Sequence, residues 1–483
     1  MSKSLKVNYI YCLINTLTGV LFPLITFPYA SRILEADGIG EIGFFSSIIG
    51  YISLFTGIGI PIYAIREIAK TRDDVAIMSR TAVEILLLHT IMVIIGYVFV
   101  AILCVLISKT LIDIPLFLIL SISIFFSAIG CEWFYKGIEE FKYIAIRGII
   151  VRVVFVILLF TLVHNKADIL IYAGLTVLGN VGNNVFNFVR LWKYIKPQYL
   201  QIKDLNIFRH FIPSLRIFVL NCVISLYINL DTVMIGFIKD NYAVGYYEGA
   251  SKIARLVVAV IQALQTALIP RFSYFAKKND MAAFHELCQK VVDFVVTICL
   301  PLTAGLIVMA PTLIHLFCGP TYTPAILTLE VISPIVVMIS LSGIACFQIL
   351  YPLGKEMLAI WSTATGALVN LIICFLLIPK YAHNGAAVAV LFGEITVTFT
   401  MFFYGRKYIC IKYLSMHYLN CLIGSLLMFV VLVVIRRAHY DDILNLFIIP
   451  TIGILVYSIY LYLRKDSFGM YIIEMINNKI HRS

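Results

Sequence analysis

The sequence predicts an all-α polytopic membrane protein with about fourteen transmembrane helices. Of its 483 residues, 61% are hydrophobic and only 13% are charged, whereas soluble chains carry roughly 25% charged residues. The mean hydropathy is +0.98, and apolar runs near the ~20 residues that span a bilayer recur between Val7 and Leu463. This composition argues against a soluble enzyme, a nucleic-acid-binding protein and a disordered scaffold.

The apolar runs locate the helices in order along the chain. The first six cover about 7–30, 42–65, 81–107, 114–135, 143–163 and 168–190, the next six about 213–238, 243–270, 289–310, 324–350, 357–378 and 384–405, and a last pair about 411–435 and 443–463. The longest connection, near residues 191–212, is polar and basic. We therefore expect an N-terminal six-helix lobe (1–192), a cytoplasmic linker (193–212), a C-terminal six-helix lobe (213–408), an extra helix pair (409–465) and a cytoplasmic tail (466–483).

The net charge of +11 is explained by membrane topology rather than by a nucleic-acid partner. The 37 Lys and Arg residues form no long basic block, and they collect at the ends of apolar runs, for example in residues 66–80 and 271–280. Because positively charged loops are retained in the cytoplasm, this distribution places both termini inside. Most of the eleven Cys residues lie within apolar runs, so neither a metal site nor a disulfide framework is expected.

The two six-helix halves resemble each other weakly. Gly179 and Phe188 in the first half correspond to Gly393 and Phe402 in the second. Halves with an even number of helices enter the membrane in the same orientation. This predicts a parallel repeat with a pseudo-twofold axis along the membrane normal and a central cavity.

Polar residues inside the apolar runs indicate where that cavity lies, because such groups avoid lipid. The helix at 243–270 carries one polar stripe at helical spacing, formed by Glu248, Ser251, Lys252, Arg255, Gln262 and Thr266. Arg255 is expected near the middle of the membrane. One interpretation is a Glu248/Lys252 pair with Arg255 satisfied by a neighbouring helix, and the other is a cationic site in a water-filled cavity, which we favour.

Other helices contribute polar groups to the same picture. Lys136, Arg147 and Arg66 lie near helix ends, so their side chains are expected to extend to the membrane interface. Arg and Lys in a site of low dielectric stabilise a phosphate, and Asn, Gln and Ser suit sugar hydroxyls. The predicted cationic site in the cavity consists of Arg255, Lys252, Arg152, Arg66 and Arg32. The predicted polar lining of the cavity consists of Asn15, Asn221, Ser225, Asn229 and Gln262. The candidate ion-coupling groups are Asp231, Glu248 and Glu394. No catalytic residue is expected.

Five segments of the chain resemble the polysaccharide transporter family, the Wzx-type flippases of the multidrug/oligosaccharidyl-lipid/polysaccharide superfamily. They are LFPLITFPYASRILEADGIGEIGFF (21–45), YAIREIAKTRDD (63–74), EWFYKGIEEFKYIAIR (132–147), LDTVMIGFIKDNYAVGYYEGASKI (230–253) and LLIPKYAHNGAAVAVLFGE (376–394). The residues that match the family pattern are Arg66, Glu67, Glu132, Trp133, Gly137, Glu139, Asp231, Gly236, Gly245 and Lys252.

This resemblance implies alternating access between two six-helix lobes, which moves an undecaprenyl-diphosphate-linked oligosaccharide from the cytoplasmic to the periplasmic leaflet of the bacterial inner membrane, for O-antigen or other surface polysaccharide. It implies that no cofactor is needed and that transport is coupled to a proton or sodium gradient. It also implies that polymerase and chain-length proteins of the same pathway are partners. An extra helix pair also occurs in the related lipid II flippases, where it forms a groove for the lipid tail.

Two other functions remain open at this point. A drug or cation antiporter of the same superfamily would share the fold, but its cavity is expected to carry acidic and aromatic groups. An integral-membrane O-antigen polymerase or ligase needs a large periplasmic loop, and the outer loops here are only roughly 5–13 residues long. The basic stripe at 243–270 favours the flippase.

Overall fold

The computed structural model describes residues 5–106, 113–200, 203, 205–266, 268–408, 411, 415–437 and 441–466. Every regular element in these ranges is a helix. Ten helices there are long and apolar enough to cross a membrane, or eleven when one bent pair is counted as a span. The prediction of an all-α polytopic membrane protein is confirmed, while the count of fourteen spans stays a prediction.

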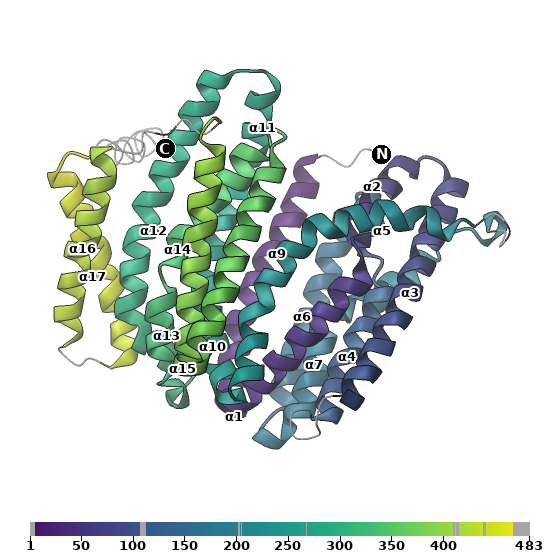
Figure 1. Cartoon of the computed structure of the whole chain (residues 1–483), viewed down its shortest axis with the longest axis horizontal. Coiled ribbons are helices and arrows are strands. Elements are labelled where there is room, and N and C mark those ends of the chain that lie inside the picture. Colours follow the sequence, from purple (N-terminus) through teal and green to yellow (C-terminus); the bar gives the residue numbers. More distant parts are fainter. Residues whose placement is uncertain are drawn as a thin grey trace. The chain divides into compact units, whose positions relative to one another are not determined.

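The chain forms two compact units, Met1–Gly236 and Phe237–Ser483. Unit 1 contains α1 (Leu5–Gly57), α2 (Ile60–Thr71), α3 (Val75–Leu106), α4 (Ile114–Ala128), α5 (Glu132–Gly137), α6 (Phe141–Leu162), α7 (Ile169–Val181), α8 (Asn183–Leu191) and most of α9 (Phe211–Ile238). These are the purple to teal helices in Figure 1. Short 3-10 turns η1 (Lys166–Asp168), η2 (Pro197–Tyr199) and η4 (Ile207–His210) lie between them.

Unit 2 contains α10 (Asn241–Thr266), α11 (Ile269–Lys277), α12 (Met281–Phe317), α13 (Ala325–Ile332), α14 (Ile335–Gly343), the π-helix η6 (Ile344–Leu350), α15 (Glu356–Gly405), α16 (Met416–Arg436) and α17 (Asp442–Leu463). The 3-10 turn η5 (Pro320–Tyr322) follows α12. The yellow-green pair α16 and α17 packs against α12 in Figure 1. Its core includes Val308, Cys421, Met428, Leu432 and Ile449.

Two long helices are each interrupted by a single residue. Glu35 (φ 54°) breaks α1 and Ala382 (φ 48°) breaks α15. The expected loops at 31–41 and 379–383 are therefore helical apart from these residues. A one-residue break needs only a local change of φ and ψ. Because such a break does not require the polar composition of a loop, hydropathy does not distinguish it from a loop or from a continuous helix.

The two arms of α15 run antiparallel and touch closely. The hydroxyl of Thr365 donates to that of Thr400 at 3.4 Å. A Cβ added to Gly366 would lie 2.2 Å from Cγ2 of Val397 and 2.8 Å from the carbonyl oxygen of Gly393. Glycine at this position allows the arms to approach.

The connection expected as a cytoplasmic linker is packed onto α3. The backbone N–H of Lys196 donates to Ser79 Oγ at 3.2 Å, and that of Asn206 donates to Glu84 Oε1 at 2.7 Å. The two compact units divide within α9 and not in this connection. The predicted lobe and linker boundaries are not tested by this division and stay a prediction.

Candidate functional site

Arg152 lies in the middle of α6, the 22-residue helix that runs from Phe141 to Leu162. The guanidinium Nη1 donates to the backbone oxygen of Asn15 at 3.2 Å and to its Oδ1 at 3.3 Å, and it also contacts the hydroxyl of Thr18. At 1.5 Å per residue, Arg152 is about 16 Å from the start of a helix about 33 Å long. The structure thus brings together two predicted residues, Arg152 and Asn15, at the middle of a span.

Glycine makes this contact between α1 and α6 possible. A Cβ on Gly148 would lie 3.0 Å from Asn15 Oδ1, and one on Gly19 would lie 3.5 Å from Arg152 Nη2. The partners of Arg152 are neutral, and within the described residues no carboxylate forms an ion pair with it. A half-buried positive charge is therefore held by hydrogen bonds to neutral groups, with Glu132 acting on it only from beyond ion-pair distance.

Asp231 and Asn229 on α9 belong to the same unit. Asp231 is only 1% exposed, and it lies near the phenol of Tyr51 on α1. Asn229 also faces α1, because a Cβ on Gly50 would lie 3.5 Å from its Nδ2. The side chains of the other two predicted α9 residues, Asn221 and Ser225, are outside the described part of the structure.

Arg32 and Arg66 occupy the surface of unit 1. Arg32 is exposed on α1, shortly before the break at Glu35. The side chain of Arg66 is 58% exposed and its Nε donates to Glu67 Oε1 at 3.3 Å. That its side chain extends to the membrane interface stays a prediction.

The predicted stripe on α10 becomes more exposed from Glu248 towards Thr266. Arg255 is exposed, and its Nε donates to the buried hydroxyl of Ser251 at 3.1 Å. Lys252 and Glu248 are half-buried, and Gln262 is exposed. The opposite face of α10 is packed with small and apolar residues such as Ala250, Ala254 and Val258.

Glu394 and Gln265 are buried polar groups of unit 2. Glu394, on the second arm of α15, is 9% exposed. Gln265, which is not part of the predicted stripe, donates from Nε2 to the backbone carbonyl oxygen of Ser340 at 2.8 Å. Its own carbonyl oxygen accepts a hydrogen bond from Gln348 Nε2 in the π-helix at 2.8 Å. These bonds tie the end of α10 to α14 and η6.

Arg147 contradicts the expectation that its side chain extends to the interface. It is 5% exposed, and its Nη2 donates to Glu132 Oε2 at 2.7 Å. Glu132 also pairs with Lys136 at 2.8 Å, and Lys136 is exposed as expected. The partner of Arg147 stands on another helix, 15 positions away, so no helical spacing in the sequence revealed the pair.

The connection near residue 200 contributes a second buried polar cluster. His210 Nδ1 lies 2.8 Å from the Tyr63 hydroxyl, and Nε2 lies 2.9 Å from Glu84 Oε2. Burial lowers the pKa of His210 from its ordinary value of 6.5, and the hydrogen bond to Glu84 opposes that change. The lowered pKa keeps the imidazole neutral near pH 7, and its Nε2 faces both Glu84 and the Nε of Arg209, which lies 3.2 Å away.

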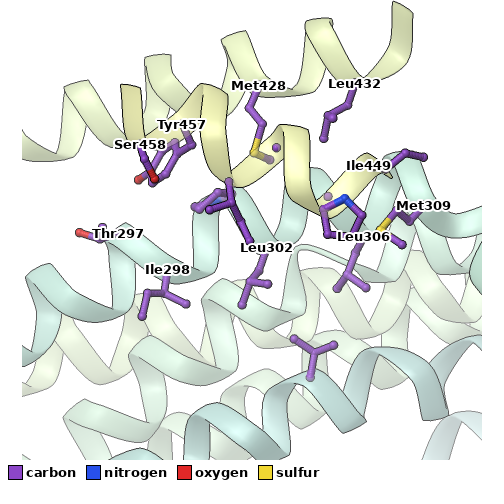
Figure 2. Close-up of a pocket in the computed structure, with 16 residues that line it drawn as sticks. Thr297, Ile298, Leu302, Leu306, Met309, Met428, Leu432, Ile449, Tyr457 and Ser458 are labelled. Atoms are coloured by element: carbon purple, nitrogen blue, oxygen red, sulfur yellow. The ribbon is translucent and has the colours of Figure 1, made fainter. Parts of the chain in front are cut away.

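Figure 2 shows an apolar pocket of about 380 Å³ in unit 2. Ile298, Leu302 and Leu306 of α12 line one side, and Met428 of α16 and Ile449 of α17 line another. Its few polar groups include Thr297 and Ser458. Such a lining favours a hydrocarbon chain over a charged ligand. Among the described residues, no group of three His, Cys, Asp or Glu side chains could hold a metal ion.

Comparison with known proteins gives consistent matches. The family described as "Polysaccharide biosynthesis protein" matches residues 5–276. The chain is 26% identical to the "Putative O-antigen transporter" of Escherichia coli (strain K12) over 84% of its own length and 97% of that protein. Among solved structures, the inward closed lipid II flippase MurJ is similar with a TM-score of 0.75 and 16% identity, covering 95% of this chain and 99% of that one. An inward-facing multidrug resistance MATE family transporter has a TM-score of 0.64 and 14% identity, covering 82% and 97%.

Proposed function

This chain belongs to the family of polysaccharide biosynthesis proteins, and from that premise we propose that it is a flippase for a lipid-linked oligosaccharide and not an enzyme. The substrate is an oligosaccharide repeat unit on undecaprenyl diphosphate. It moves from the cytoplasmic to the periplasmic leaflet of the bacterial inner membrane by alternating access. The similarity to a "Putative O-antigen transporter" over 97% of that protein and the fold shared with a lipid II flippase support this assignment.

Arg152 is the observation that carries the proposal. An Arg within an apolar span is costly and marks a substrate or ion pathway. Here no carboxylate of the described residues forms an ion pair with it, since the nearby Glu132 pairs with Lys136 and Arg147, and Asn15 and Thr18 leave part of the guanidinium fork available. A diphosphate supplies the missing negative charge, while the polar side chains of α1 and α9 suit sugar hydroxyls.

The finer architecture is part of the same proposal. Counting the arms of α1 and α15 separately, together with α9 and the bent pair α7–α8, gives the fourteen predicted spans. With two parallel six-helix lobes, both termini are cytoplasmic. The lipid tail remains in the bilayer or in apolar pockets such as that of Figure 2, while the headgroup crosses. Polymerase and chain-length proteins of the pathway receive the product.

A carboxylate buried in a span is the natural group for coupling to an ion gradient. Asp231 and Glu394 are the most buried of the three candidates, and Glu248 is half-buried. We propose that one of the two buried groups binds a proton or Na⁺ during the cycle. Flipping that is unchanged when both gradients are collapsed would refute this.

Reconstituted flipping tests the main proposal. Proteoliposomes containing a fluorescent undecaprenyl-diphosphate oligosaccharide are assayed for headgroup access from outside. Arg152→Gln is expected to slow flipping about tenfold or more, as expected for the loss of a charge-assisted hydrogen bond to phosphate. Arg152→Lys should retain part of the activity, because it keeps the charge.

The matched control is Arg72→Gln, which removes an exposed Arg that pairs with Glu139 at 2.7 Å. It should flip at the wild-type rate. Arg255→Ala is expected to abolish surface polysaccharide in cells at a normal protein level, with exposed Arg271→Ala as its control. Wild-type flipping by the Arg152→Gln protein would overturn the proposal.

The similarity to a multidrug MATE transporter favours a second candidate function, export of cationic drugs. The positive charge of Arg152, which has no ion-pair partner among the described residues, opposes it, because a cation in the same pathway is repelled. Ethidium efflux from cells that produce the chain distinguishes the two. Efflux above background without flipping would favour the antiporter.

A further inference from the structure

A second apolar groove, separate from the pocket of Figure 2, lies on the surface of unit 2. It has a volume of about 590 Å³ and runs between α12, α14, the second arm of α15 and α16. Val292, Leu341, Ile395, Phe399 and Phe403 form much of its wall. Phe399 is 69% exposed and Ile395 is also exposed, so the groove is open along its length.

One end of this groove is cationic. Arg406, directly after α15, is part of the lining, and its Cζ lies 4.8 Å from the centre of the Phe403 ring. Lys355, at the start of the first arm of α15, reaches the same end. Its Nζ lies 5.5 Å from the centre of the Tyr408 ring, within the range of a cation–π contact. Lys407 stands beside Arg406 and is exposed.

These three cations keep their positive charge uncancelled. Within the described residues, no carboxylate forms an ion pair with Lys355, Arg406 or Lys407, although Glu356 is the chain neighbour of Lys355. Basic residues beside an apolar groove at the end of a membrane span are the arrangement that binds anionic lipid head groups.

The dimensions of the groove favour a phospholipid over a long polyprenyl chain. Ile395 and Arg406 are eleven positions apart on α15, which corresponds to about 16 Å of helix. That is about half of the ~30 Å hydrocarbon layer, the depth of one leaflet. An acyl chain that fills the groove therefore places its phosphate at Arg406.

We propose that this groove binds an anionic phospholipid, with one acyl chain against α12, α14 and α15 and the phosphate between Arg406, Lys355 and Lys407. Arg406 provides a planar fork for two phosphate oxygens, and the two lysines provide point charges. Tyr418, at the start of α16, lies at the same rim. This site does not depend on the proposed flippase function.

Native mass spectrometry of the full-length protein in detergent tests the site. The probes are phosphatidylglycerol and phosphatidylcholine with identical acyl chains. The wild-type protein should retain phosphatidylglycerol preferentially. Lys355→Gln and Arg406→Gln should each weaken its retention about fivefold, the effect expected for one cation near a membrane surface.

Lys380→Gln is the matched control. Lys380 Nζ lies 5.2 Å from the Tyr381 ring, an equivalent cation–π contact at the opposite end of the same hairpin. It should retain both lipids as the wild type does. Ile395→Trp fills the groove and should reduce retention of both lipids. Lys355→Gln and Arg406→Gln test the proposal even if the Ile395→Trp protein does not fold.

Three results would overturn the proposal. One is equal retention of the two lipids by the wild-type protein. Another is an effect of Lys380→Gln as large as that of Lys355→Gln. The third is displacement of phosphatidylglycerol by equimolar undecaprenyl phosphate, which would assign the groove to the lipid carrier. None of these measurements uses flipping, so failure here leaves the proposed function unaffected.

Discussion

The imidazole of His210 lies 2.9 Å from the carboxylate of Glu84, and both side chains are buried. Glu84 belongs to α3, and His210 ends the connection that follows α8. Because Glu84 also accepts the backbone N–H of Asn206, one carboxylate fixes two points of that connection. The segment expected as a linker is therefore anchored to unit 1.

Acidification should weaken this anchor. Burial lowers the pKa of His210, so below pH ~6.5 the unfolded chain binds a proton that the folded chain excludes. The contribution of His210 to the free energy of unfolding should therefore decrease as pH falls from 7.5 to 5.5. His210→Gln keeps a hydrogen-bonding group without this titration and should flatten the dependence, measured by thermal unfolding in detergent. His164→Gln, at an exposed position, is the control. An identical slope for His210→Gln would contradict the assignment.

Glu132 should be far more important for stability than Glu139. Glu132→Ala leaves the buried Arg147 without its counter-charge, which typically costs about 3–5 kcal/mol. Glu139→Ala breaks an exposed pair with Arg72 and should cost less than about 1 kcal/mol. Chemical denaturation of the purified variants measures both values. Equal losses would show that the pair with Arg147 is not a desolvated one.

Gly366→Ala should separate the arms of α15. The new methyl group meets a backbone carbonyl oxygen at 2.8 Å as well as Val397, so the backbone must shift, at a cost of about 1–3 kcal/mol. Gly305→Ala on α12 meets no atom within 4 Å and should be neutral or slightly stabilising. The melting temperatures of the two proteins provide the comparison. A Gly366→Ala protein that melts with the wild type would mean that the arms are loosely packed.

Gln265 and Gln262 should have opposite phenotypes. Gln265→Leu leaves the Ser340 carbonyl without this donor and should cost about 1–3 kcal/mol of stability. Gln262→Leu changes an exposed side chain, so stability should change by less than about 0.5 kcal/mol. If Gln262 lines the transport pathway, its substitution slows flipping instead. Thermal unfolding and the flipping assay, applied to both variants, separate the two roles.

Composition and hydropathy were sufficient to predict the fold class, because a bilayer imposes long apolar helices on any sequence that spans it. The contact of Arg152 with Asn15 was predictable in kind, since polar groups in apolar runs avoid lipid. The identity of the residue that contacts Arg152 was not predictable, because helical spacing describes neighbours on one helix only. The same limit hid the pair between Arg147 and Glu132, and it made Gln262 and Gln265 hard to distinguish. The break at Ala382 depends on backbone angles that composition does not encode.

The neutral partners of Arg152 have an electrical consequence. A charge near the middle of the apolar layer lies within the field of the membrane potential, where a full crossing is worth about 2.3 kcal/mol per 100 mV. Half of that crossing is worth about 1 kcal/mol. Because Asn15 and Thr18 do not cancel the charge, the membrane potential biases every rearrangement that changes the depth of Arg152, with no ion bound.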